Sequence, residues 1–132
     1  MRKSQLAAGL IAIAALSLSL ASCAPSQPFS DVPTATLPAA MEGKVGAPIK
    51  DSVRLLGEDS SGTSYYVGTW AEKQGETCLL IVKASDQLRT CSATLPITAV
   101  FAGKRATLDA SPASSPAPDG SELVGKYLLV RS

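Results

Sequence analysis

The stretch Cys78-Leu79-Leu80-Ile81-Val82 is an uninterrupted apolar run in the second half of the chain. Successive side chains of a strand point to opposite faces, so a run without alternation is apolar on both faces. We therefore expect this stretch to form a central strand of a sheet that is covered on both sides.

Further strand-like runs flank this stretch, and turn residues separate them about every eight to twelve positions. They are rich in residues favoured on a pleated, half-buried surface. The runs cover residues 52–56, 63–71, 88–92, 95–101, 105–109 and 122–131. We predict a mainly β fold over residues 50–132: a small antiparallel sheet, or a partly open barrel or sandwich, of about six to seven strands. Residues 110–121 are rich in Pro, Ser, Ala and Gly and predict a mobile loop.

Residues 1–22 have the pattern of an export signal. Arg2 and Lys3 precede an uncharged apolar run of fifteen residues, 6–20. As a helix this run would rise about 22 Å, short of the ~30 Å hydrocarbon core of a bilayer. Its length and basic start predict a signal peptide over residues 1–22 rather than a membrane span.

The end of this run, Leu20-Ala21-Ser22-Cys23, resembles the lipobox of bacterial lipoproteins, in which a branched apolar residue and two small residues precede a cysteine. The resemblance implies that diacylglycerol is attached to the thiol of Cys23 and that the bond between Ser22 and Cys23 is cut. Because two acyl chains give stable attachment, we expect a protein anchored by lipid to the extracytoplasmic face of the cell membrane, with no cofactor besides this covalent lipid. The alternative is ordinary secretory cleavage after Ala21.

Three cysteines, Cys23, Cys78 and Cys91, bear on this choice. An exported protein with an odd number leaves one thiol unexplained, whereas lipid on Cys23 leaves two thiols that can pair. We predict a Cys78–Cys91 disulfide, since exported cysteines are normally oxidised. The alternative is a redox-active or metal-binding pair, but the spacing is not CxxC and the chain contains no histidine.

Residues 23–49 differ in composition from the rest of the chain. Their apolar residues follow no regular period, and their prolines are spaced among Ala, Ser, Thr and Gly. The prolines are Pro25, Pro28, Pro33, Pro38 and Pro48. Such a segment buries too little apolar surface to offset its chain entropy. We expect a disordered tether between the lipid and the β domain, with a reach of about 25 to 80 Å.

Catalytic groups are sparse. The absence of histidine removes the commonest general base and metal ligand, and the acidic residues fall mostly in predicted turns with no spacing that selects a pair. Loss of residues 1–22 removes two positive charges, Arg2 and Lys3, and changes the net charge from +1 to about −1. With no basic stripe, nucleic acid is not an expected partner. We predict a protein that is not an enzyme and has no metal site.

Tyr66 and Trp70 are the one aromatic pair that suggests a binding surface. On an extended strand they share a face, with Gly68 between them. Such a pair could form a shallow stacking platform for sugar rings or a peptide. The alternative, which we favour, is that this face is simply core or an ordinary cross-strand surface.

The order of Val53-Arg54-Leu55-Leu56-Gly57, Tyr65-Tyr66-Val67, the stretch 78–82 and Cys91 resembles small exported or membrane-tethered actinobacterial proteins. This resemblance implies a β domain and no particular activity. The sequence thus predicts a lipid-anchored, non-catalytic binding or accessory module of the cell envelope, whose partners are the membrane and an envelope protein or wall polymer. Two alternatives stay open: a cell-wall hydrolase using carboxylates or a Ser-Lys pair, and an assembly or inhibitor subunit that binds a partner through a sheet edge.

Overall fold

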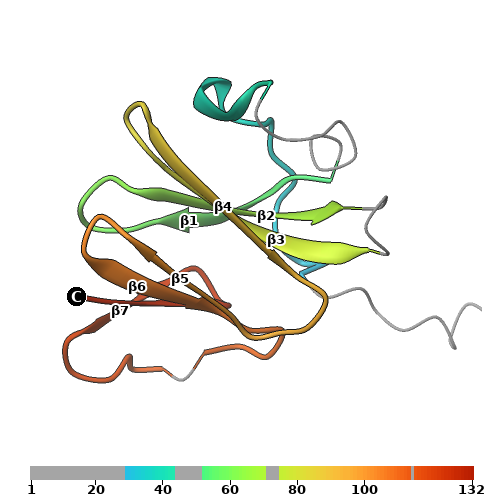
Figure 1. Ribbon diagram of the computed structural model, residues 1–132. Coiled ribbons are helices and arrows are strands. Elements are labelled where there is room, and N and C mark those ends of the chain that lie inside the picture. Colours follow the sequence, from blue (N-terminus) through green and yellow to red (C-terminus); the bar gives the residue numbers. More distant parts are fainter. Residues whose placement is uncertain (1–28, 44–51, 71–74, 114) are drawn as a thin grey trace, which may run out of the picture.

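Two four-stranded antiparallel sheets make up the folded body of the protein (Figure 1). The computed structural model describes residues 29–43, 52–70, 75–113 and 115–132. The first sheet has the strand order β1-β2-β3-β4 and the second β5-β6-β8-β7. The elements are η2 (Ala39–Met41, a 3-10 turn), β1 (Arg54–Glu58), β2 (Ser64–Trp70), β3 (Glu76–Lys83), β4 (Asp86–Ser92), β5 (Ile97–Phe101), β6 (Lys104–Leu108), β7 (Ser121–Val124) and β8 (Leu128–Arg131). The predicted mainly β fold is confirmed.

The main core lies between the facing sides of the two sheets. Alternate residues of β2 and β3 point into it, among them Tyr65, Val67, Leu79 and Ile81, and meet side chains of the second sheet such as Leu108. Leu79, Ile81 and Leu108 are completely buried. Side chains therefore alternate along each strand between this core and the opposite face of the sheet.

A second core lies on the opposite face of the first sheet. Cys78 and Leu80 of β3 point into it and pack with Val53, Leu37 and Met41. All four residues 78–81 are completely buried, because one pair faces each core. The prediction of a central strand covered on both sides is thereby confirmed, and the covering layer on this side comes from the segment before β1.

That segment, residues 29–43, corrects the predicted tether. Phe29 and Val32 belong to the main core, while Leu37 and Met41 belong to the second core. Their spacing shows no period of 2 or 3.6 because an irregular chain places them on two different surfaces. Residues 29–43, called the arm below, are thus part of the folded body. The rest of the predicted tether, residues 23–28 and 44–49, and the predicted signal peptide lie outside the described residues.

The backbone of the arm covers the outer edge of β1. The amide of Ala35 donates to the carbonyl of Val53 (2.9 Å), and the amide of Leu55 donates to the carbonyl of Pro33 (2.9 Å). The guanidinium of Arg54 donates to the carbonyl of Val32 at 2.7 Å. Because these bonds satisfy backbone groups that an edge strand leaves open, the arm protects this edge from pairing with another chain.

The predicted strand at residues 122–131 is two strands, β7 and β8, paired as a hairpin. The chain reverses at Gly125, which has φ of +62°. A side chain at this position would collide with the carbonyl oxygen of Leu56 on β1. Glycine is therefore required twice, by the backbone conformation and by the close approach of the two sheets.

The segment between β6 and β7, predicted as a mobile loop, lies against this hairpin. The amide of Ala113 donates to the carbonyl of Lys126 at 2.9 Å, and the amide of Ser121 donates to the carbonyl of Pro118 at 3.0 Å. The first bond places the segment beside the turn that precedes β8, and the second lies within the segment at its junction with β7. Its mobility stays a prediction.

Candidate functional site

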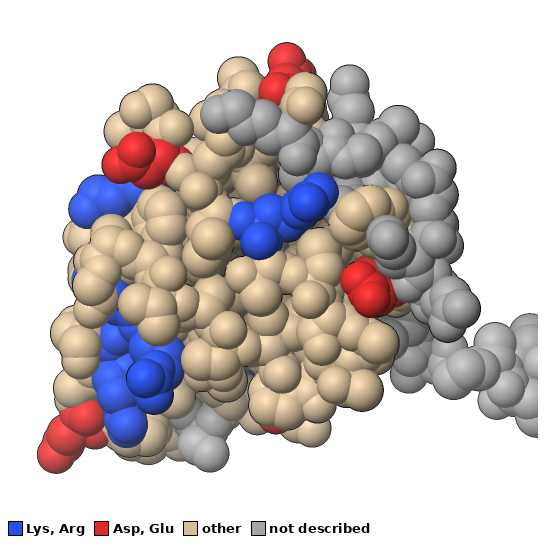
Figure 2. Space-filling model, viewed as in Figure 1, with Lys and Arg blue, Asp and Glu red and all other residues tan. Residues whose placement is uncertain are grey.

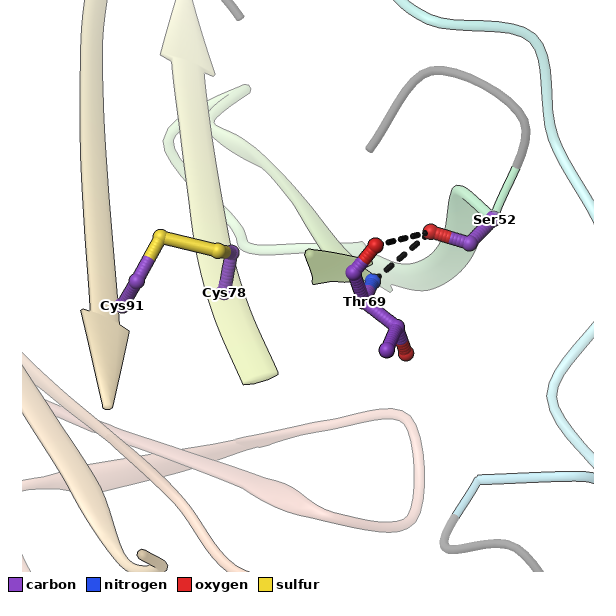
Figure 3. Close-up of a disulfide and its surroundings, with 4 residues drawn as sticks. All are labelled: Ser52, Thr69, Cys78 and Cys91. Atoms are coloured by element: carbon purple, nitrogen blue, oxygen red, sulfur yellow. Dashed lines mark hydrogen bonds between the residues drawn. A yellow bond between two sulfur atoms is a disulfide. The ribbon is translucent and has the colours of Figure 1, made fainter. Parts of the chain in front are cut away.

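Cys78 and Cys91 form the predicted disulfide. They lie directly opposite each other on β3 and β4, with an S–S distance of 2.06 Å (Figure 3). Cys78 is completely buried in the second core. Nearby, the hydroxyl of Ser52 accepts a bond from the amide of Thr69 (2.7 Å) and donates to its carbonyl (2.9 Å). The bridge joins an inner strand to the edge strand of the sheet, in surroundings typical of a structural disulfide.

Tyr66 and Trp70 share a face of β2, as the strand geometry requires. Both side chains are largely buried and pack against the second core, which includes Leu37 and Met41 of the arm. The guanidinium carbon of Arg89 lies 4.9 Å from the centroid of the Trp70 ring. This packing agrees with the interpretation that the face belongs to the core, and a stacking role for the pair stays a prediction.

The best-formed polar cluster surrounds Asp59, in the loop between β1 and β2, and was not foreseen. Its carboxylate accepts bonds from the amide and hydroxyl of Ser61 (2.9 and 2.6 Å), the amide of Thr63 (3.1 Å) and the hydroxyl of Tyr65 (2.9 Å). The ammonium of Lys104 lies 3.6 Å away, and the Asp59 side chain has no exposed surface. A buried charge is tolerated here because every side of the carboxylate is met by a donor.

These contacts lower the pKa of Asp59 and raise the pKa of Tyr65. Burial alone would raise the pKa of Asp59, but the hydrogen bonds from Ser61, Thr63 and Tyr65 together outweigh it and lower the pKa to about 2. Burial and the bond to Asp59 raise the pKa of Tyr65. Neither group exchanges a proton near neutral pH, so the cluster suits a structural role rather than acid–base catalysis. The signal for it was the Asp-Ser-Ser-Gly turn, in which an Asp side chain binds nearby amides.

A second polar cluster fastens the arm to the turn before β8. The carboxylate of Asp31 accepts bonds from the hydroxyl of Tyr127 (2.6 Å) and the ammonium of Lys126 (2.9 Å). The rings of Phe29 and Tyr127 meet edge to face, with centroids 5.1 Å apart. The bonds from Tyr127 and Lys126 lower the pKa of Asp31 and raise the pKa of both partners. No local pattern could reveal this cluster, since about 95 residues separate its members.

Replacement of Asp31 by alanine is expected to loosen the arm without unfolding the sheets. The amide of Leu55, which is bonded to the arm, should then exchange its hydrogen several-fold faster, because the arm opens more often. Amides in the middle of β3 should be unaffected. Hydrogen exchange followed by NMR measures both, and Glu42→Ala, an exposed acid of the same arm, is the control. Equal exchange in the two variants would contradict a fastening role for Asp31.

Other kinds of site are absent from the described ranges. Their His, Cys, Asp and Glu side chains form no group of three that could hold a metal ion. Nor does the described part of the chain contain a helix that is long and apolar enough to span a membrane. Ser22 and Cys23, the predicted cleavage and lipidation residues, lie outside the described part of the chain.

Comparison of the chain with protein-family models, curated proteins and solved structures found no match. The fold and its clusters define a small two-sheet β domain with one disulfide and an arm that covers a sheet edge. Any account of its function rests on the chain itself.

Proposed function

We propose that the protein is a membrane-anchored lipoprotein whose β domain is a non-catalytic binding or accessory module on the extracytoplasmic face of the membrane. The lipobox-like residues 20–23 support the anchor. The cysteine pairing supports it as well, because Cys78 and Cys91 satisfy each other and leave Cys23 for the lipid. An oxidised pair is also typical of exported proteins.

The docked arm bears directly on how such an anchor would hold the domain. The described part of the arm begins at Phe29, and only residues 24–28 lie between it and Cys23 in the sequence. Six residue steps span at most about 22 Å even when fully extended. An anchored domain would therefore stay beside the lipid headgroups, much closer than a disordered tether over the whole of residues 23–49 would allow. Its membrane-facing end would carry Phe29, Asp31 and Lys126.

The contacts of the carboxylates of Asp59 and Asp31 support a binding role rather than a catalytic one. The two clusters around Asp59 and Asp31 connect loops and the arm to the sheets, and their carboxylates are already paired with lysine and tyrosine. Hydrolysis through a carboxylate pair needs two acids facing a common space, one of them able to release a proton. The observation that carries the proposal is the lipobox-like stretch 20–23 in a chain whose other two cysteines pair with each other.

Replacement of Cys23 by alanine tests the anchor. We expect the variant to appear in the medium or to stay unprocessed, whereas Ser22→Ala, which keeps a small residue before the cysteine, should remain with the membrane. The intact mass of the membrane-extracted wild-type protein should show loss of residues 1–22, a diacylglyceryl group and two fewer hydrogens for the disulfide. Full partition of a processed Cys23→Ala variant into membranes would contradict the proposal.

A further inference from the structure

The outer face of the second sheet carries a row of basic side chains. Register places Arg105 of β6 directly opposite Arg131 of β8, and Val100 of β5 opposite Arg105 on its other side. The intervening residues Ala106 and Val130 point into the main core, so this row points to solvent. Both arginines are exposed, and Val100 is 62% exposed.

Two arginines in directly opposite positions repel each other and destabilise the pairing of their strands. Neither arginine forms an ion pair within the described part of the chain, where the ion pairs are Lys104–Asp59 and Lys126–Asp31. Arg131 only donates from Nε to the hydroxyl of Ser121 at 3.4 Å. Such an arrangement is unfavourable for the fold alone and favourable where an anion binds between the two guanidinium groups.

A hollow of about 230 Å³ lies at this row. Its lining residues are Val100, Gly103, Lys104, Arg105, Arg131 and Ser132. Figure 2 shows Lys and Arg side chains gathered at the lower left, over the region where β6 lies in Figure 1. The hollow is therefore lined by three positively charged side chains, Lys104, Arg105 and Arg131.

A second hollow, of about 250 Å³, lies one step along the same face. Thr107 and Leu129, each two residues from an arginine of the row, pair directly across β6 and β8 and line it. The segment after β6 forms its far wall. The other lining residues are Asp109, Ser111, Pro112, Ala113, Pro118 and Tyr127. This hollow is mostly aliphatic, with a few hydroxyl groups and one carboxylate.

We propose that this face binds an extended peptide that carries a carboxylate and, two positions away, an apolar side chain. Alternate residues of an extended peptide lie about 6.6 to 6.8 Å apart on one face, which is also the step from Arg105 to Thr107 or from Arg131 to Leu129. The carboxylate lies between the arginines and the apolar side chain enters the second hollow. That hollow is smaller than the roughly 300–1,000 Å³ of a small-molecule pocket, so it takes one side chain.

The same features disfavour a polyanion. A phosphodiester polymer would bring its next negative charge near the carboxylate of Asp109, in the lining of the second hollow. A peptide with a neutral residue there meets no such repulsion. The proposal deepens the binding-module function proposed above, and it does not depend on the lipid anchor.

NMR titration of the full protein in detergent micelles tests the proposal. The probe is a six-residue peptide, capped at both ends, with leucine at position three, glutamate at position five and threonine or serine elsewhere. Amide signals of Arg105, Thr107, Leu129 and Arg131 should move together. The matched peptide with glutamine at position five should bind at least about ten-fold more weakly, as expected for loss of a charged hydrogen-bond acceptor.

Variants separate binding from stability. Arg105→Gln and Arg131→Gln should each weaken peptide binding about ten-fold or more while keeping or raising the melting temperature, since each removes the like-charge repulsion. Arg89→Gln on β4 removes the same charge elsewhere and should not change binding. The proposal is overturned by no signal shift at about 5 mM peptide, by equal binding of the glutamine peptide, or by stronger binding of inorganic phosphate or anionic vesicles at these residues. None of these results bears on membrane attachment through Cys23.

Discussion

Replacement of Asp59 by asparagine is expected to lower the free energy of unfolding at pH 7 by about 2 kcal/mol. The carboxylate is held with a pKa of about 2, against an ordinary value of 3.8, by donors that favour its charged form. That difference corresponds to about 2 kcal/mol of preference for the ionised group in the folded state. Asparagine keeps one acceptor oxygen for Ser61 and Thr63, but its amide faces the hydroxyl of Tyr65 and the ammonium of Lys104.

The same carboxylate makes stability depend on pH. Its folded-state pKa is lower than its unfolded-state pKa, so the stabilisation is fully present above about pH 5 and is lost as the pH falls from about 4 to 2. Urea unfolding followed by Trp70 fluorescence between pH 2 and pH 7 measures this loss. The Asp59→Asn protein should show a correspondingly flatter profile over that window.

Asp119→Asn, a change to an exposed acid in the segment before β7, serves as the control and should leave both the stability and the profile nearly unchanged. If the Asp59 variant unfolded at the same urea concentration as wild type at pH 7, the cluster would not stabilise the fold. An unchanged acid limb in that variant would assign the pH dependence to other carboxylates.

Local patterns were sufficient for much of the fold. The run 78–82 identifies the central strand because an apolar residue on each face demands cover on each side, and both covers exist. The pairing of the cysteines was predicted from their odd number and from the expected export signal, and the structure places Cys78 opposite Cys91 in adjacent strands. The central strand depends on residues that are close in the sequence, and the pairing of the cysteines depends on their number, so the sequence alone predicts both.

The arm and the final hairpin depended on contacts between distant residues. The spacing of the prolines in residues 29–43 is typical of a disordered segment. The contacts of Phe29 and Asp31 with Tyr127, which hold this segment on the domain, cannot be read from that spacing. Gly125 weakens a strand or a helix alike, and only the approach of Leu56 shows why the chain turns there. Tertiary contact overrides composition at both places, as it often does for segments with weak local preference.

The candidate surfaces also combine features that the local sequence predicts with features that depend on contacts between distant residues. Tyr66 and Trp70 were correctly placed on one face of a strand, but the cover of that face comes from the arm, which is distant from β2 in the sequence. Arg105 and Arg131 are likewise far apart in the sequence and become neighbours only through the strand order β6-β8. A search for basic runs in the sequence therefore could not find the pair.

Removal of the disulfide is expected to have the largest effect on stability. In a Cys78→Ala/Cys91→Ala variant the unfolded chain regains the freedom that a closed loop of about fourteen residues had removed, which corresponds to roughly 3 kcal/mol. A domain of this size has a total stability of about 5–10 kcal/mol, so the fold should persist but melt roughly 12 to 24 °C lower.

Denaturant unfolding of three forms distinguishes this effect from a packing defect. Wild type treated with reductant keeps both cysteines and should lose nearly as much stability as the double variant, because the lost constraint acts on the unfolded chain in both. A packing defect at Cys78, which is completely buried, would destabilise the double variant and leave the reduced wild type unaffected. Reduction that changed stability by less than about 1 kcal/mol would contradict a structural role and revive the redox alternative for Cys78 and Cys91.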